Sequence, residues 1–132
     1  MNEPLYIKAG FTSYAVGVPC NEFLPCDFQM LLRIIAQNAP VIKQALGAEE
    51  LPVVWLKGRL WFPWFPLRGV PGEIQIYTDL IFRLCDMAQL WYIPPENRHV
   101  RRGRFGMWLL LRDLGLWEPK QRKVRKFLLK NF

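Results

Sequence analysis

The chain has 132 residues, a length typical of one domain, and 52% of them are hydrophobic, which excludes an intrinsically disordered protein. No apolar run approaches the roughly 20 residues of a membrane-spanning helix, and the N-terminus lacks the basic-then-apolar layout of a signal peptide. Three cysteines at irregular spacing are not typical of a secreted disulfide framework, so we expect reduced thiols, no membrane association and a cytoplasmic location.

The charge is distributed unevenly along the chain. Residues 1–92 contain seven Lys and Arg against eight Asp and Glu, a net charge of −1, whereas residues 93–132 contain eleven against three, a net charge of +8. A positive excess confined to one end indicates an anionic partner. We expect a single domain over residues 1–132, made of a near-neutral α+β core (1–92) and a basic helical C-terminal part (93–132).

The first third of the chain predicts strand structure followed by a helix. Residues 5–18 are rich in β-branched and aromatic residues and predict two short strands, or one ragged strand that begins near Ser13. Apolar residues spaced three and four apart then predict an amphipathic helix over 26–46. Pro40 should kink this helix, or split it with Asn38 as the cap of a second segment, and Gly47 should end it.

A β-hairpin is predicted next. The apolar segments 53–56 and 59–62 flank Lys57-Gly58, a two-residue loop in which Gly can adopt a positive φ. Pro63 and Pro66 limit the second strand, and place it at a sheet edge or end it there.

The rest of the chain predicts helices. The longest pattern covers 73–92, a basic loop follows over 96–104, and a helix over 105–114 has Phe105, Trp108 and Leu109 along one line. Gly115 should end that helix, and Glu118-Pro119 should open the last one, whose apolar seam is Val124, Phe127, Leu128 and Phe132. The predicted architecture is α+β: a small antiparallel sheet (the N-terminal strand plus the 53–63 hairpin) packed on helices, with a basic C-terminal helix-turn-helix-like tail.

The sequence does not favour catalysis. It contains no P-loop, no dinucleotide-binding glycine motif and no H-E-x-x-H motif. The single histidine, His99, lies among arginines, which disfavour its protonation. Cys20, Cys26 and Cys85 lack the close spacing of zinc ligands, and the carboxylates form no convergent set. We therefore predict no enzyme activity, no catalytic residues, no cofactor and no metal site, and keep a small hydrolase or nuclease as the least favoured alternative.

The aromatic residues of the hairpin have two interpretations. Trp55, Trp61 and Trp64 are possible partner contacts that stack on bases. On a hairpin in a domain of this size, however, such residues more often cover the core. Alternation places Trp61 and Phe62 on opposite faces, so one of them should be exposed unless the sheet is covered on both sides.

The basic C-terminal part is the strongest functional signal. A helix docked by the predicted seam would turn its cations to solvent, where they suit a phosphate backbone. The candidate nucleic-acid-binding residues are Arg98, Arg101, Arg102, Arg104, Lys120, Arg122, Lys123, Arg125, Lys126 and Lys130. A basic face on a terminal helix can also be only a solvated surface.

Four segments resemble a known family: VIKQALGAEELPV, LWFPWF, IYTDLIFRLCDMA and FLLKNF. They are similar to short "virulence-related" proteins encoded on conjugative and integrative elements of Firmicutes, over about residues 38–132. The chain departs from that family in its arginine-rich loop 98–104 and in ending at Phe132. The resemblance implies a bacterial, cytoplasmic, mobile-element setting, and it supplies no catalytic residues to transfer.

Two functions are therefore expected. The favoured one is a non-enzymatic accessory protein of a mobile element that binds nucleic acid or a nucleoprotein complex through its basic C-terminal surface. The alternative is a protein-directed inhibitor of a bacterial host-defence nuclease, in the manner of an anti-CRISPR protein.

Overall fold

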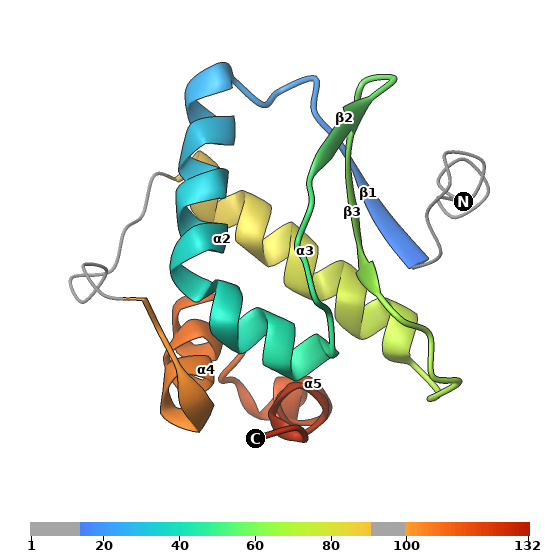
Figure 1. The fold of residues 1–132 in the computed structure, drawn as a ribbon, viewed down its shortest axis with the longest axis vertical. Coiled ribbons are helices and arrows are strands. Elements are labelled where there is room, and N and C mark those ends of the chain that lie inside the picture. Colours follow the sequence, from blue (N-terminus) through green and yellow to red (C-terminus); the bar gives the residue numbers. More distant parts are fainter. Residues whose placement is uncertain (1–13, 91–99) are drawn as a thin grey trace.

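Residues 14–90 and 100–132 are described by the structure, a computed structural model of the chain. The elements, in chain order, are β1 (Tyr14–Pro19), α2 (Pro25–Leu46), β2 (Val54–Leu56), β3 (Arg59–Phe65), α3 (Glu73–Gln89), α4 (Gly103–Asp113), the short 3-10 helix η1 (Pro119–Gln121) and α5 (Arg122–Leu129). One small antiparallel sheet and a set of packed helices occupy separate parts of the molecule (Figure 1), which confirms the predicted α+β class.

The sheet has the strand order β1-β3-β2, and both strand pairs are antiparallel. β2 and β3 form the predicted hairpin, in which Leu56 pairs with Arg59. Lys57 and Gly58 have φ values of 51° and 75°, as a two-residue turn with the twist of the flanking strands requires. β1 confirms the strand expected near Ser13, and the part of that prediction before residue 14 lies outside the described residues.

The predicted edge position of β3 is wrong, because β3 is the central strand and continues through Pro63 to Phe65. The pairing with β2 extends only as far as Trp61. On the other side, the register with β1 shifts between Tyr14 and Val16. Pro63 therefore lies beyond the β2 ladder and beside an irregularity of the β1 ladder, where its missing N–H costs little.

Helix α2 is continuous from Pro25 to Leu46 although Pro40 lies inside it, so the alternative of two segments capped by Asn38 is wrong. The helix axis changes direction in its C-terminal half (Figure 1), in line with the kink expected at a proline. Asn38 is buried, and its Nδ2 donates a hydrogen bond of 2.9 Å to the carbonyl oxygen of Ile34. Gly47 ends the helix with a φ of 72°, as predicted.

Helix α3 is fixed at its N-terminal end by a buried carboxylate. Glu73 accepts hydrogen bonds from the backbone N–H groups of Arg68 and Gly69, at 2.8–3.1 Å, and from the hydroxyl of Tyr77 at 3.1 Å. Burial alone would raise the pKa of Glu73, but these hydrogen bonds outweigh it and lower the pKa below 4.5. Burial and the bond to Glu73 raise the pKa of Tyr77 to about 12. The helix ends at Gln89, earlier than the predicted Tyr92.

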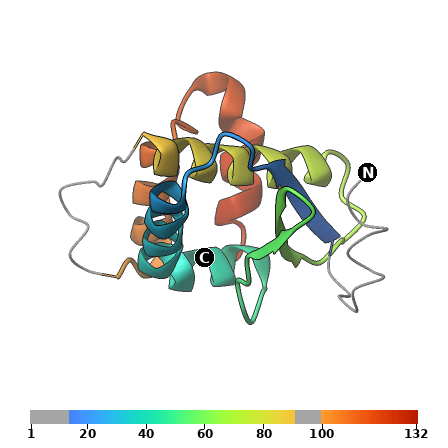
Figure 2. The same ribbon diagram turned by 90° about the horizontal axis from the view of Figure 1, so that it is seen from above.

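The sheet and α2 lie side by side along α3 (Figures 1 and 2), and α2 also packs against α4. One hydrophobic cluster includes residues from β1 to α5, so both halves of the chain share a core. Trp61 lies outside that cluster and packs with Ala15 on the other face of the sheet. A Cβ at Gly17 would lie 2.8 Å from the Trp61 ring, so only glycine allows β1 to approach the indole this closely.

Candidate functional site

Arg101, which precedes α4, is buried; it forms an ion pair with the last residue of α4 and a backbone hydrogen bond to α2. Arg101 is 6% exposed, and its Nη2 lies 2.6 Å from Oδ2 of Asp113. The backbone N–H of Arg101 also donates to the carbonyl oxygen of Gln37 in α2, at 3.0 Å. Arg101 therefore positions α4. It does not belong to the exposed basic surface, although the sequence predicted it as one of the binding residues.

Helix α5 docks through the predicted apolar seam. Val124 and Leu128 are buried, and Phe127 packs edge-on against Tyr77, with ring centroids 5.8 Å apart. After the helix, Asn131 donates from Nδ2 to the carbonyl oxygen of Ala45 at 3.0 Å. Because this seam faces the core, the remaining sides of α5 turn outward with their cations.

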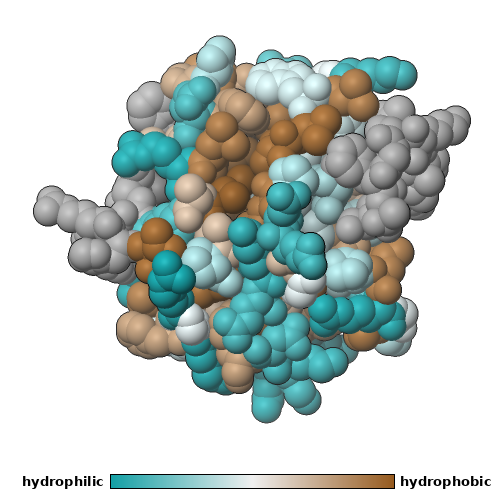
Figure 3. All heavy atoms as spheres, in the orientation of Figure 1, coloured by the Kyte–Doolittle hydropathy of each residue, from teal (hydrophilic) through white to brown (hydrophobic). Residues whose placement is uncertain are grey.

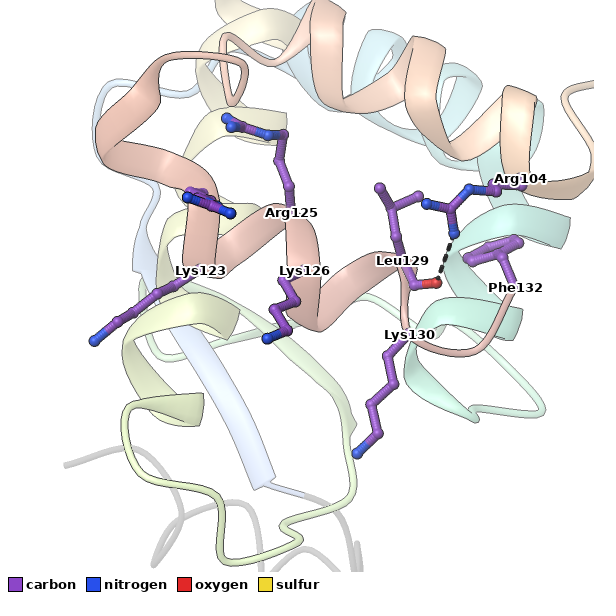
Figure 4. Close-up of a pocket in the computed structure, with 8 residues that line it drawn as sticks. Arg104, Lys123, Arg125, Lys126, Leu129, Lys130 and Phe132 are labelled. Carbon is purple, nitrogen blue, oxygen red and sulfur yellow. Dashed lines mark hydrogen bonds between the residues drawn. The ribbon is translucent and has the colours of Figure 1, made fainter.

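A groove of about 730 Å³ lies where α4 and α5 meet (Figure 4), and six cations line it. They are Arg104 from α4 and Arg122, Lys123, Arg125, Lys126 and Lys130 from α5 and the residue after it, together with the apolar Leu129 and Phe132. All six belong to the set predicted from the sequence. Figure 3 shows hydrophilic side chains gathered at the end of the molecule to which α5 belongs.

Two of the lining arginines also have structural partners. Arg104 donates from Nη1 to the carbonyl oxygen of Leu129 at 3.3 Å, the bond drawn in Figure 4. Arg125 donates to the carbonyl oxygens of Leu116 and Glu118, at 3.0 and 2.7 Å. These two guanidiniums fix the shape of the groove and keep their positive charge beside it.

The other four lining cations differ from these two arginines. Within residues 14–90 and 100–132, the side chains of Arg122, Lys123, Lys126 and Lys130 make no hydrogen bond or ion pair. Lys123 and Lys130 are exposed, and their side chains point away from the backbone of α5 and of the residue after it (Figure 4). Helix α5 contains no Asp or Glu to neutralise them. Four cations on one short helix and the residue that follows it, with no partner among the described residues, form a site that suits an anion with several charges.

Two further predicted basic residues, Arg102 and Lys120, do not line the groove. Arg102 is exposed at the start of α4, and Lys120 forms an exposed ion pair of 3.2 Å with Glu118. Arg98 lies outside the described residues, as does His99.

The predicted stacking residues of the hairpin divide into two buried rings and one exposed ring. Trp61 and Trp64 are buried, and their indole N–H groups donate to the carbonyl oxygens of Leu56 and Pro52. Neither ring is available to a partner, so the interpretation as core residues holds for both. Trp55 is 48% exposed and lies edge-on against Phe28, at 5.5 Å between centroids.

A second aromatic group, not predicted from the sequence as a contact surface, lies on α4. The sequence pattern placed Phe105 and Trp108 along one line of the predicted helix. In the structure, these two side chains do not face the core. The buried face of α4 is Met107, Leu110 and Leu111. The i, i+3 spacing of two aromatic residues directly after Arg104 is the signal that could have identified an exposed aromatic strip.

No group of three or more His, Cys, Asp or Glu that could hold a metal ion occurs in the described part of the chain. All three cysteines are free, and burial, with a contribution from nearby Asp86, raises the pKa of Cys85 to about 12. That thiol is therefore protonated at neutral pH and is not a nucleophile. Among the described helices, none has the length and apolar character to cross a membrane.

Comparison of the chain with protein-family models, with curated proteins and with solved structures finds no match in any of the three. Its function is therefore inferred from its own residues.

Proposed function

We propose that this protein binds nucleic acid, free or within a nucleoprotein complex, through the basic groove between α4 and α5. The observation that carries the proposal is a set of four cations that line this groove, have no partner in the described part of the chain and have no carboxylate on α5 beside them: Arg122, Lys123, Lys126 and Lys130. A phosphate backbone offers anions at regular intervals, and each contact releases counterions.

The arrangement of these cations is unfavourable for the helix alone. Arg122 and Lys123 lie in the first turn of α5, where the helix dipole disfavours positive charge. Lys126 follows them at i+4 and i+3, so the like charges repel each other. A polyanionic ligand would relieve both effects, which supports binding over a merely solvated surface.

We also propose that α4 and α5 act together as a helix-turn-helix-like pair. The link at Leu114–Trp117 joins the two helices, and Gly115 has the positive φ of 74° expected for its turn. The protein would act by binding and not by catalysis, as an accessory of a bacterial mobile element in the cytoplasm. The resemblance to the virulence-related family supports that setting.

The test is a fluorescence-anisotropy titration with duplex DNA, single-stranded DNA and RNA at low and physiological salt. The variant Arg122→Ala/Lys123→Ala/Lys126→Ala removes three charges from the groove and leaves Arg125, which is structural, in place. Its matched control, Arg33→Ala/Lys57→Asn/Arg59→Ala, removes three exposed charges elsewhere; Asn tolerates the positive φ of Lys57.

We expect the groove variant to lose affinity. The slope of log affinity against log salt concentration should become less negative by about 2–3, roughly 0.9 for each lost phosphate contact on duplex DNA. The control should bind like the natural chain. Equal losses in both variants would show that net charge alone drives binding and would contradict the groove.

A second candidate function is supported by a different surface. Trp55 of the hairpin packs edge-on against Phe28 of α2 and stays half-exposed. Figure 3 shows a hydrophobic area between α2 and the hairpin. Such a patch suits a protein partner, and we propose the protein-directed inhibitor of a host-defence nuclease as the alternative function. If the natural chain binds no nucleic acid at either salt concentration, this alternative replaces the first. Binding to the nuclease should then resist salt and fall in Trp55→Ala.

A further inference from the structure

Three aromatic rings form a continuous strip on the outer side of α4 and the link that follows it. Phe105 and Trp108 are stacked, with centroids 5.7 Å apart and planes 10° apart. Trp108 meets Trp117 edge-on at 5.1 Å. Phe105 is 70% exposed and Trp117 is 39% exposed. Burial therefore does not explain this strip, in contrast to the rings of β3.

The strip borders the basic groove at two points. The guanidinium of Arg125, a lining residue of the groove, lies 4.6 Å from the centroid of the Trp117 ring. At the other point, Arg104 also lines the groove and precedes Trp108 by four residues on α4, so the two share a helix face. A ligand in the groove thus has aromatic faces within reach along its flank.

A surface with cations on one side and an exposed aromatic ring, Phe105, on the other matches one class of nucleic acid. In a duplex the faces of the bases are already stacked on each other and only phosphates and base edges are accessible. A single strand has both its phosphates and its base faces available, and proteins bind it through basic grooves flanked by aromatic side chains. Stacking tolerates any sequence because every base has a π-face.

We infer that the ligand of the groove is single-stranded nucleic acid, whose phosphates lie along Lys123, Lys126 and Lys130 while an unstacked base stacks on Phe105. This inference rests on the proposed function and names the form of nucleic acid that the same site takes.

The experiment compares three fluorescent probes on the full-length chain at physiological salt. They are a mixed-sequence DNA strand of about 12 nucleotides, an abasic strand of the same length, and the corresponding duplex. We expect the strand with bases to bind about tenfold more tightly than the abasic strand, a ratio within the range reported for one stacked base.

The variant Phe105→Ala should lose that tenfold advantage and keep its affinity for the abasic strand and the duplex. The matched control is Phe82→Ala, which removes an exposed phenylalanine from α3. Circular dichroism checks the fold of each variant. Phe105→Leu, which keeps the apolar bulk but not the aromatic face, serves as a second variant and should show the same loss.

Equal affinity of the natural chain for the abasic strand and the strand with bases would overturn the stacking inference and leave the basic groove intact. An equal loss for all three probes in Phe105→Ala would overturn it as well. Absence of binding to every probe would overturn the proposed function itself, so the two failures are distinguishable.

Discussion

The body of the protein and its C-terminal helices differ in whether their charged side chains have partners. In the body, Glu73 is buried and accepts hydrogen bonds from two backbone N–H groups and a tyrosine hydroxyl. In the C-terminal part, one cation, Arg101, is buried and paired with Asp113, while the four on the groove make no hydrogen bond or ion pair with any described residue. The charges of Glu73 and Arg101 stabilise the fold, whereas the four cations of the groove are exposed at the surface.

The largest effect should come from breaking the buried pair. Asp113→Ala would leave the Arg101 guanidinium buried without its carboxylate, because the Asp113 side chain is only 2% exposed. We expect a loss of about 3–5 kcal/mol in the free energy of unfolding, measured by urea denaturation.

The matched control is Glu118→Ala, which breaks the exposed pair with Lys120 and should cost at most about 1 kcal/mol. Replacement of both partners, Arg101→Met/Asp113→Leu, should recover part of the stability, because apolar side chains leave no buried charge to desolvate. If Asp113→Ala is no worse than Glu118→Ala, Arg101 is not an anchor and belongs with the surface cations after all.

A smaller effect, with a distinct pH dependence, is expected at Glu73. Its pKa is lowered in the folded protein, so its contribution to stability is complete above the unfolded value of about 4.5 and is lost as the pH falls through the folded value. Glu73→Gln should cost about 1–3 kcal/mol at pH 7, because it replaces charge-assisted hydrogen bonds by neutral ones.

Thermal melts between pH 7 and pH 3 check this prediction. The natural chain should lose stability in the acid range more steeply than Glu73→Gln, and the difference between them should shrink as the pH falls. Glu49→Gln, at an exposed glutamate, should follow the natural chain. Parallel curves for the natural chain and Glu73→Gln would contradict the role of this carboxylate.

The sequence predicted the features that depend on neighbouring residues. Lys57-Gly58 specifies its turn locally, and the spacing of Val124 and Leu128 specifies the buried side of α5. The location of Pro63 in a central strand could not be predicted, because it depends on where two other strands stop pairing.

The same limit applies to the candidate site. The cations of the groove were identified because they are close in sequence, but Arg101 was grouped with them, since its partner Asp113 is twelve residues away. Trp64 and Phe105 are both aromatic residues next to apolar ones, yet one is 1% and the other 70% exposed. Exposure depends on which elements cover a ring, and a single sequence does not contain that information.

The smallest expected effect tests whether the charges of α5 are kept for a ligand. Lys126→Glu would replace like-charge neighbours at Arg122, Lys123 and Lys130 by attractive ones, and each such pair is worth about 0.2–0.5 kcal/mol. We expect the free energy of unfolding to rise by roughly 0.5–1 kcal/mol at low salt, and the gain to shrink as salt screens the charges. Nucleic-acid affinity should fall in the same variant.

The control for this last prediction is Arg33→Glu on α2, where the residues three and four positions away, Gln29, Met30, Ala36 and Gln37, are uncharged, so neither stability nor binding should change. A variant of α5 that is more stable but binds less tightly would mean that the chain retains repulsion in its last helix because the ligand needs those cations. If Lys126→Glu changes neither quantity, the basic side of α5 is only a solvated surface, and the difference between the two regions is one of solubility.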